Sequence, residues 1–305
     1  MNIFDAINHT SFLDHNGIVE SVQPFEKVSI ETTVGRLIPI HAVEDHGRKK
    51  LTPVKLYKNG AIRSMSLQDA TIIPTSIGEI SAELVTFYES GALRRVFPLN
   101  GKLSGYWTEK NEFRLAESIS VPTSIGTIFV KPIYMQFYET GELQSIAFWP
   151  LERVTIETPI GTIEIKNGIS FHKDGTLASC EPAAPVLVET PVGSIEAHDP
   201  DPNGMIGEKN SLSFTPQGEL SGLSTTNAVV NSADGDRDLS FSPVVERSMC
   251  SDTAFTIRPL RIAFRKDVYL FWSALTPRKA VSASADFSVM PFHTDKVLAG
   301  AHCSL

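Results

Sequence analysis

The sequence predicts an all-β protein of repeated antiparallel hairpins, which form a meandering or solenoid-like sheet with a distinct C-terminal cap. Two glycine-containing elements alternate along the chain at regular spacing, and apolar residues stand at every second position between them. This alternation is typical of a half-buried strand, and glycine supplies the positive φ that tight hairpin turns require.

The first element is a turn that ends in Gly, usually after an aromatic residue. The second element reads Thr, then Pro, Ser or Thr, then an aliphatic residue and Gly. Copies of the first end at Gly17, Gly60, Gly91, Gly141, Gly175 and Gly218, and copies of the second end at Gly35, Gly78, Gly126, Gly161 and Gly193. In three pairs (Gly17 to Gly35, Gly60 to Gly78, Gly175 to Gly193) the glycines are 18 residues apart. We therefore interpret these glycines as turn positions of one repeated unit.

Three steps are longer than the others. Gly91 and Gly126 are 35 residues apart with a further Asn100-Gly101 turn between them, which predicts one extra hairpin. The steps from Gly35 and from Gly193 to the next turn glycine are both 25 residues, which predicts inserted loops near 41–51 and 198–210. No segment up to about residue 225 shows a 3.6-residue periodicity, so no helix is expected there.

The composition changes after the repeats. We predict a β-repeat array over 1–225, a linker or loop over the Ser-, Asn- and Asp-rich 226–240, a C-terminal β cap over 241–280 and a loose tail over 281–305. The cap would protect an edge of the array, because an unpaired strand edge invites association.

One segment resembles a known repeat. Phe87–Leu93 followed by Leu99–Trp107 resembles the variant bacterial MORN repeat, in which a tyrosine-rich hairpin precedes Asn-Gly-Lys and a Gly-aromatic-Trp step. The resemblance covers residues 87–111. It implies an open antiparallel sheet used as a scaffold or binding surface, and it implies no activity.

Composition excludes several classes of protein. The chain has 305 residues and a formal net charge of -8, which argues against a nucleic-acid-binding surface. Its apolar runs, such as Val268–Trp272, are much shorter than a membrane-spanning helix, and Met1–Phe12 has no basic residue of a secretory signal, so we expect a soluble, cytoplasmic protein. Three cysteines without a CxxC motif predict neither disulfides nor a zinc site. The oligomeric state is left open.

The two insertions are the places to seek chemistry, because loops added to a regular scaffold often carry function. His41 to His46 holds two imidazoles and two carboxylates, which are metal-ligand types without the spacing of a known motif. Asp199 to Gly204 begins like a calcium loop but has Asn210 at its twelfth position instead of Glu. Pro and Asp also favour turns in the second segment, and the first is not expected to be a helix, so no metal or cofactor is assigned.

Catalytic residues are not assigned either. Cys180 follows a turn glycine where sibling units place Val22, Met65 and Ile146, which predicts a packed core thiol. A serine recurs four residues after the turn glycine at Ser21, Ser64, Ser145 and Ser179, and a repeated serine indicates a structural position. An aromatic group near the irregular unit could stack a ligand, although packing across the sheet is the simpler interpretation; its members are Phe97, Tyr106, Trp107, Phe148 and Trp149.

Two hypotheses for function follow. The first is a repeat scaffold without enzymatic activity that binds a protein partner through its sheet face and its inserted loops. The alternative is a metal- or small-molecule-binding protein or enzyme that uses the loops at 41–46 and 199–204.

Overall fold

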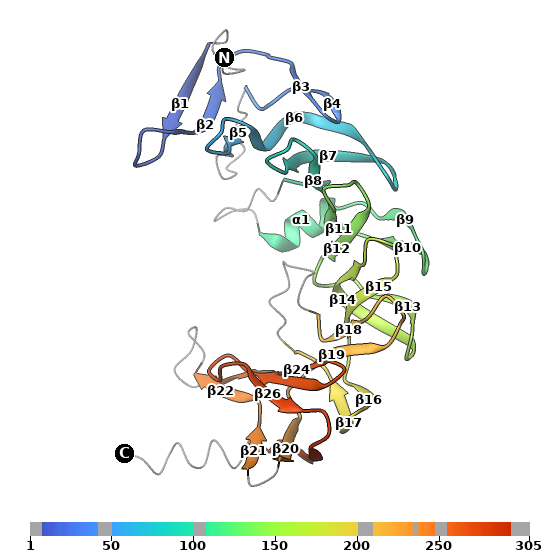
Figure 1. The fold of residues 1–305 in the computed structure, drawn as a ribbon. Helices are drawn as coiled ribbons and strands as arrows, with labels where there is room; N and C mark the ends of the chain where they lie inside the picture. The colour runs from blue at the N-terminus through green and yellow to red at the C-terminus, as the bar shows by residue number, and fades with distance from the viewer. Residues whose placement is uncertain are drawn as a thin grey trace. The chain divides into compact units, whose positions relative to one another are not determined.

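The computed structural model describes residues 8–41, 51–100, 108–200, 210–234, 237–247 and 255–293 (Figure 1). Strands make up nearly all of the secondary structure in these ranges, with one helix, α1 (Glu109–Leu115). No helix in the described part of the chain is long and apolar enough to span a membrane. The prediction of an all-β fold built from antiparallel hairpins is confirmed.

The chain divides into two compact units. The first comprises residues 1–152 with 171–175, and the second comprises residues 153–170 with 176–305. The boundary that we expected near residue 225 therefore falls inside the second unit.

The first unit contains an antiparallel sheet whose hairpins follow one another in chain order, from β1 in blue to β12 in green (Figure 1). Its strands, in spatial order, are β1 (His9–Leu13), β2 (Val19–Pro24), β5 (Val54–Leu56), β6 (Ile62–Thr75), β7 (Gly78–Phe87), β8 (Leu93–Phe97), β11 (Pro132–Phe137) and β12 (Leu143–Phe148). Two side hairpins branch from this meander: β3 (Ile30–Thr32) with β4 (Gly35–Leu37), and β9 (Ile119–Thr123) with β10 (Gly126–Val130).

The second unit repeats this plan. Its sheet has the order β14 (Gly161–Phe171), β15 (Leu177–Pro182), β18 (Leu212–Phe214), β19 (Leu220–Thr225), β24 (Leu260–Phe264), β25 (Val268–Trp272) and β26 (Lys279–Ser282). Its smaller pieces are β13 (Val154–Thr158) on β14, the hairpin β16 (Val186–Thr190) with β17 (Gly193–Ala197), the hairpin β22 (Val244–Arg247) with β23 (Phe255–Arg258), and the trio β21 (Arg237–Phe241), β20 (Ala228–Asp234) and β27 (Asp286–Pro291).

Three local predictions were wrong. The segment 226–240 was expected to be a loop, but it forms β20 and most of β21, because β20 pairs on both sides with β21 and β27. The tail expected at 281–305 includes β27, while residues 294–305 lie outside the described ranges. A helix, α1, stands where only strands were expected, and the turn proposed at Asn100-Gly101 lies partly outside the described residues.

The turn glycines have the expected geometry. At the aromatic turns the backbone closes with a pair of hydrogen bonds; for example, Tyr57 N–H donates to Ala61 O at 2.8 Å and Gly60 N–H donates to Tyr57 O at 2.9 Å. Gly60 has φ of +85°, a conformation that side chains disfavour. In the second element the Thr hydroxyl donates to the carbonyl of the Gly three residues on, as from Thr75 to Gly78 at 2.6 Å. This bond recurs at Thr32, Thr123, Thr158 and Thr190. The Thr and Gly of the second element thus have the same structural role in all five copies.

Tyrosine hydroxyls join consecutive hairpins of the first unit. Tyr57 Oη donates to Phe87 O at 2.9 Å and Tyr88 Oη donates to Phe137 O at 2.9 Å. Tyr138 continues the series by donating to Phe171 O at 3.0 Å. The aromatic turn residue therefore fixes the distance to the next hairpin, which explains why an aromatic residue with a hydroxyl recurs there.

The two 25-residue steps occur at equivalent places. Gly17, Gly35 and Gly60 each have a counterpart 158 residues later, at Gly175, Gly193 and Gly218. The hydrogen bonds at the base of the insertions match as well: Ile40 N–H donates to Ser66 O at 3.0 Å, and His198 N–H donates to Ser224 O at 3.0 Å. Both units therefore contain the same frame with an insertion at the same point.

Candidate binding surface

The sheet of the first unit presents two different faces. One face is an apolar row in which each residue is paired with the next across neighbouring strands, and each of its members is fully buried. The row runs Val22, Val54, Met65, Val85, Val96, Met135 and Ile146. It forms the core of the unit, and the adjacent residue of each strand must point to the opposite face.

The opposite face carries a polar row. Its members are paired in the same way and run Ser21, Lys55, Ser64, Thr86, Arg95, Gln136 and Ser145. Lys55 is exposed, whereas Ser64, Thr86 and Arg95 are partly exposed. Gln136 and Ser145 are buried. Solvent therefore reaches this face over β5 to β8.

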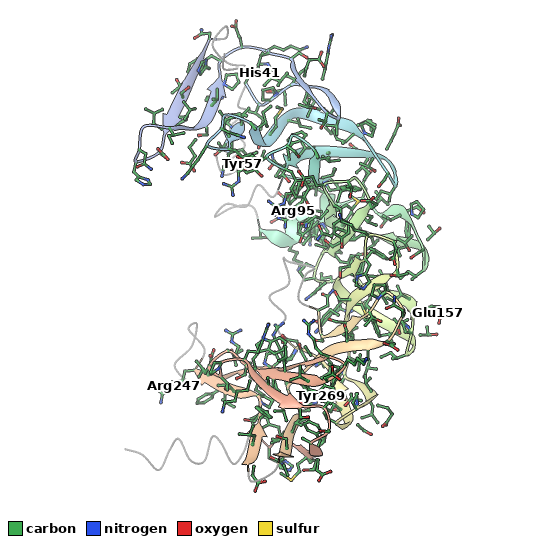
Figure 2. All side chains as sticks on the ribbon, in the orientation of Figure 1. His41, Tyr57, Arg95, Glu157, Arg247 and Tyr269 are labelled. Atoms are coloured by element: carbon green, nitrogen blue, oxygen red, sulfur yellow. The ribbon has the colours of Figure 1, made fainter. Side chains whose placement is uncertain are left out.

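Arg95 is an exception within the repeat. It stands four residues after Gly91, the position at which four other hairpins place the recurring serine. It also follows Arg94, the extra residue of a β-bulge in β8, and Arg63 occupies the equivalent bulge of β6. Lys55, Arg63, Arg94 and Arg95 together form what we call the basic row, and Arg95 is labelled in Figure 2.

Tyrosine rings hold the arginines of the basic row. The Arg95 guanidinium lies 4.8 Å from the centroid of Tyr134 and donates a hydrogen bond to Gln136 Oε1. Arg94 lies 5.5 Å from the centroid of Tyr88, and Arg63 lies 5.9 Å from that of Tyr57. Cation–π contacts of this kind orient a guanidinium without neutralising its charge.

Three polar atoms on this face have no hydrogen-bond partner among the described residues. They are Thr86 Oγ1, Arg94 Nε and Ser145 Oγ, and all three atoms are buried. Buried donors without partners are uncommon in folded proteins and call for an explanation. Thr86 and Arg94 belong to the neighbouring strands β7 and β8, because Thr86 pairs with Arg95.

The same row in the second unit has no charge. It runs Ser179, Ser213, Gly222, Ala263, Leu270 and Ala280. At Gly222 even a methyl group would be too large, since a Cβ there would lie 2.7 Å from the carbonyl oxygen of Ile262. The basic row is therefore specific to the first unit.

The predicted loop residues are only partly described. The contacts of His41 are hydrogen bonds within the hairpin region. Its backbone N–H donates to Gln68 Oε1 at 3.0 Å, and its Nδ1 lies 3.2 Å from Pro39 O. Residues 42–50 of the first predicted loop, His46 among them, and residues 201–204 of the second lie outside the described residues. Among the described residues, no three His, Cys, Asp or Glu side chains lie close enough to hold a metal ion.

Buried ionisable groups lie at the base of the second insertion. The Glu181 carboxylate is fully buried and accepts hydrogen bonds from Ser211 N–H at 2.7 Å and from Asp199 N–H at 3.4 Å, so it joins the two flanks of the insertion. Burial raises the pKa of Glu181 to about 7, with Asp199 adding to the rise, while the two backbone donors oppose it.

A lysine stands beside Asp199. Lys166 Nζ donates to Asp199 O at 3.1 Å and lies 3.4 Å from His198 Nε2. Burial, and then the Lys166 charge, lowers the pKa of His198, which fits a neutral imidazole whose Nε2 accepts a hydrogen bond from the ammonium group. A positive charge at this place disfavours a divalent cation on Asp199.

Cys180 is the packed core thiol that the repeat predicted. Its side chain is fully buried, it pairs with the buried Leu212 of β18, and burial raises its pKa to about 12. The recurring serine is also structural in the second unit, where Ser179 Oγ shares a hydrogen bond of 2.6 Å with Ser170 Oγ and accepts one from Asn210 Nδ2 at 2.8 Å.

The described members of the aromatic group pack within the protein, one against a neighbouring strand and one against α1. Phe148 and Trp149 are buried, and the Trp149 ring lies 6.3 Å from Phe113 of α1. The Phe97 ring lies 5.3 Å from that of Tyr134. Tyr106 and Trp107 lie outside the described residues.

A groove of about 900 Å³ also lies in the first unit, among the hairpin tips. Its lining includes Ser76, Ser90 and Phe137, with the carboxylates of Glu139 and Glu142. No member of the basic row lines it, so the groove and the basic row are separate surfaces of opposite charge.

No known protein family matches this chain, and no curated protein is similar to it.

Proposed function

We propose that this chain is a β-repeat scaffold without enzymatic activity that binds a protein partner through the polar face of the first unit. The observation that carries this proposal is the basic row, which lies on an open sheet face where the repeat otherwise places serine. The inserted loops near 41–51 and 198–210 are further contact segments in this proposal.

The structural use of the repeated residues supports a scaffold. The turn glycines, the Thr hydroxyls and the Tyr hydroxyls are all engaged in bonds that build or join hairpins. Residues that depart from the repeat are free to serve another purpose, and on a rigid sheet such residues present a defined surface. A surface with arginines beside tyrosines has the composition of protein-binding sites.

Site-specific photocrosslinking tests this proposal. A photoreactive amino acid replaces Ser64, which lies in the polar row, in the full chain within cells that make the protein naturally. We expect one discrete covalent adduct, whose protein partner is identified by mass spectrometry and then binds the purified chain with fixed stoichiometry.

The matched control places the same amino acid at Thr127, an exposed position of β10 in the same unit. Thr127 should give no such adduct. Absence of an adduct from position 64, or the same adducts from both positions, would show that the polar face is not a partner-binding surface.

A further inference from the structure

We propose that the partner contacts the basic row with an acidic peptide segment. This inference rests on the proposed function and adds the chemistry of the partner. It goes beyond a general protein-binding surface because it states which side chains of the partner are recognised: carboxylates of Asp or Glu, each facing one of the cationic groups across β5, β6 and β8.

The charges of the surface are the first argument. Lys55 and Arg95 stand in the polar row, and Arg63 and Arg94 stand in the bulges next to it, so four cations lie in or beside this row on three strands. Arg36, in contrast, is paired with Glu31 on the side hairpin β3–β4. Within the described residues, no ion pair joins a member of the basic row to a carboxylate. The charges of the basic row are therefore not neutralised by carboxylates of the described chain, and a partner's carboxylates can pair with them.

The unpartnered donors are the second argument. Arg94 Nε and the hydroxyl of Thr86 both lack an acceptor, and Thr86 is the cross-strand neighbour of Arg95. A carboxylate has two oxygens and can accept from a guanidinium and a hydroxyl together. An acidic side chain that docks beside Arg94 would satisfy donors that the folded chain leaves without partners.

A peptide fits better than a nucleic acid. Four cations on a chain of net charge -8 give a local positive surface within a field that repels polyanions. A nucleic acid strand carries a phosphate at every nucleotide and is usually bound by a longer basic track. A short acidic peptide carries fewer negative charges than a nucleic acid strand of similar length, and all of them can lie against the basic row.

The test measures binding of a defined probe to the purified full chain. The probe is a fluorescein-labelled dodecapeptide of alternating Glu and Ser, and its binding is followed by fluorescence anisotropy at 50 and 300 mM NaCl. The matched peptide of alternating Gln and Ser reports binding without charge, and a labelled twelve-nucleotide uridine RNA reports binding of a polyanion of another class. We expect the Glu peptide to bind at least tenfold more tightly than either comparison probe, and less tightly at high salt.

The variant Arg94→Gln with Arg95→Ser removes the two central cations. It replaces them with Gln and Ser, the pair that stands at the equivalent positions of the next hairpin as Gln144 and Ser145, so the fold tolerates this pair. We expect the affinity for the Glu peptide to fall about tenfold. The control Arg36→Ser removes one exposed cation of the same unit and should change the affinity by less than about twofold.

The outcomes separate this inference from the proposed function. If the double variant binds the Glu peptide as tightly as the natural chain, or if the RNA binds more tightly than the Glu peptide, the acidic-segment proposal is wrong. A photocrosslinked partner at position 64 would then still support the scaffold. If the Glu peptide binds as expected but position 64 gives no adduct, the surface recognises carboxylates and the partner-binding scaffold is refuted.

Discussion

Replacing Glu181 by Gln makes the stability of the second unit less dependent on pH. In the folded chain the pKa of Glu181 is raised from 4.5 to about 7 by burial, so between these pH values the folded state holds a proton that the unfolded chain has lost. Stability from this residue is complete below pH 4.5 and declines as the pH rises to about 7. At about 1.4 kcal/mol per pH unit the decline is about 3 kcal/mol.

The assay compares the natural chain with Glu181→Gln between pH 4.5 and 8. Urea unfolding is followed by hydrogen exchange of peptides that cover 177–200, which reports the second unit. Titrations common to both proteins cancel in the difference of the two unfolding free energies. We expect this difference to be near zero at pH 4.5 and to favour Gln by about 3 kcal/mol at pH 8.

The sign of the result decides between two opposing effects. Burial raises the pKa of Glu181, whereas hydrogen bonds from Ser211 N–H and Asp199 N–H stabilise the ionised carboxylate. A difference that does not vary with pH would show that Glu181 titrates as in the unfolded chain. A difference that increasingly favours Glu as the pH rises would show that the two backbone donors outweigh burial, and it would refute the reasoning.

Three further predictions concern the repeat frame. Tyr88→Phe removes the hydrogen bond to Phe137 O and should lower the free energy of unfolding by about 1 kcal/mol, measured by urea denaturation. Gly222→Ala pushes a methyl group onto Ile262 O and should cost about 1–3 kcal/mol in the same measurement. Cys180 should resist iodoacetamide at pH 8 in the folded chain and react after unfolding, as read by peptide mass spectrometry.

Controls make these results specific. Tyr269→Phe removes a hydroxyl with no hydrogen bond in the described structure, and Ser213→Ala alters the neighbour of Gly222 without crowding, so both should leave stability nearly unchanged. A loss at Tyr269 equal to that at Tyr88 would contradict the joining role of the turn tyrosine. Equal stability of Gly222→Ala and Ser213→Ala would contradict the close approach of β19 and β24. Rapid modification of folded Cys180 would contradict its burial.

Local chemistry explains what could be predicted from the sequence. A turn that needs positive φ selects glycine at one fixed position. The spacing of these glycines therefore predicts the hairpins and their order along the chain. Strand β20 follows from pairing that the sequence does not show, because it hydrogen-bonds to β27 on one side and to β21 on the other. Ala228, Val230 and Ser232 are buried, and Ser is no obvious strand former. The seven-residue α1 is too short for a helical period to be recognised.

The candidate site is recognised by comparing the residues at equivalent positions of the repeated hairpins. The serine that recurs four residues after four of the turn glycines is structural, because this position lies on the sheet face opposite the apolar residues. The same reasoning makes Arg95 informative, because a long cation at a position built for serine contributes nothing to the apolar row and still occupies the open face. Glu181 gave a weaker signal: its counterpart 158 residues earlier is Gln23, of similar size, and the sequence does not show that the Glu181 carboxylate is buried. In a repeat protein, therefore, the residues that break the pattern on an exposed face carry more information about binding than those that keep it.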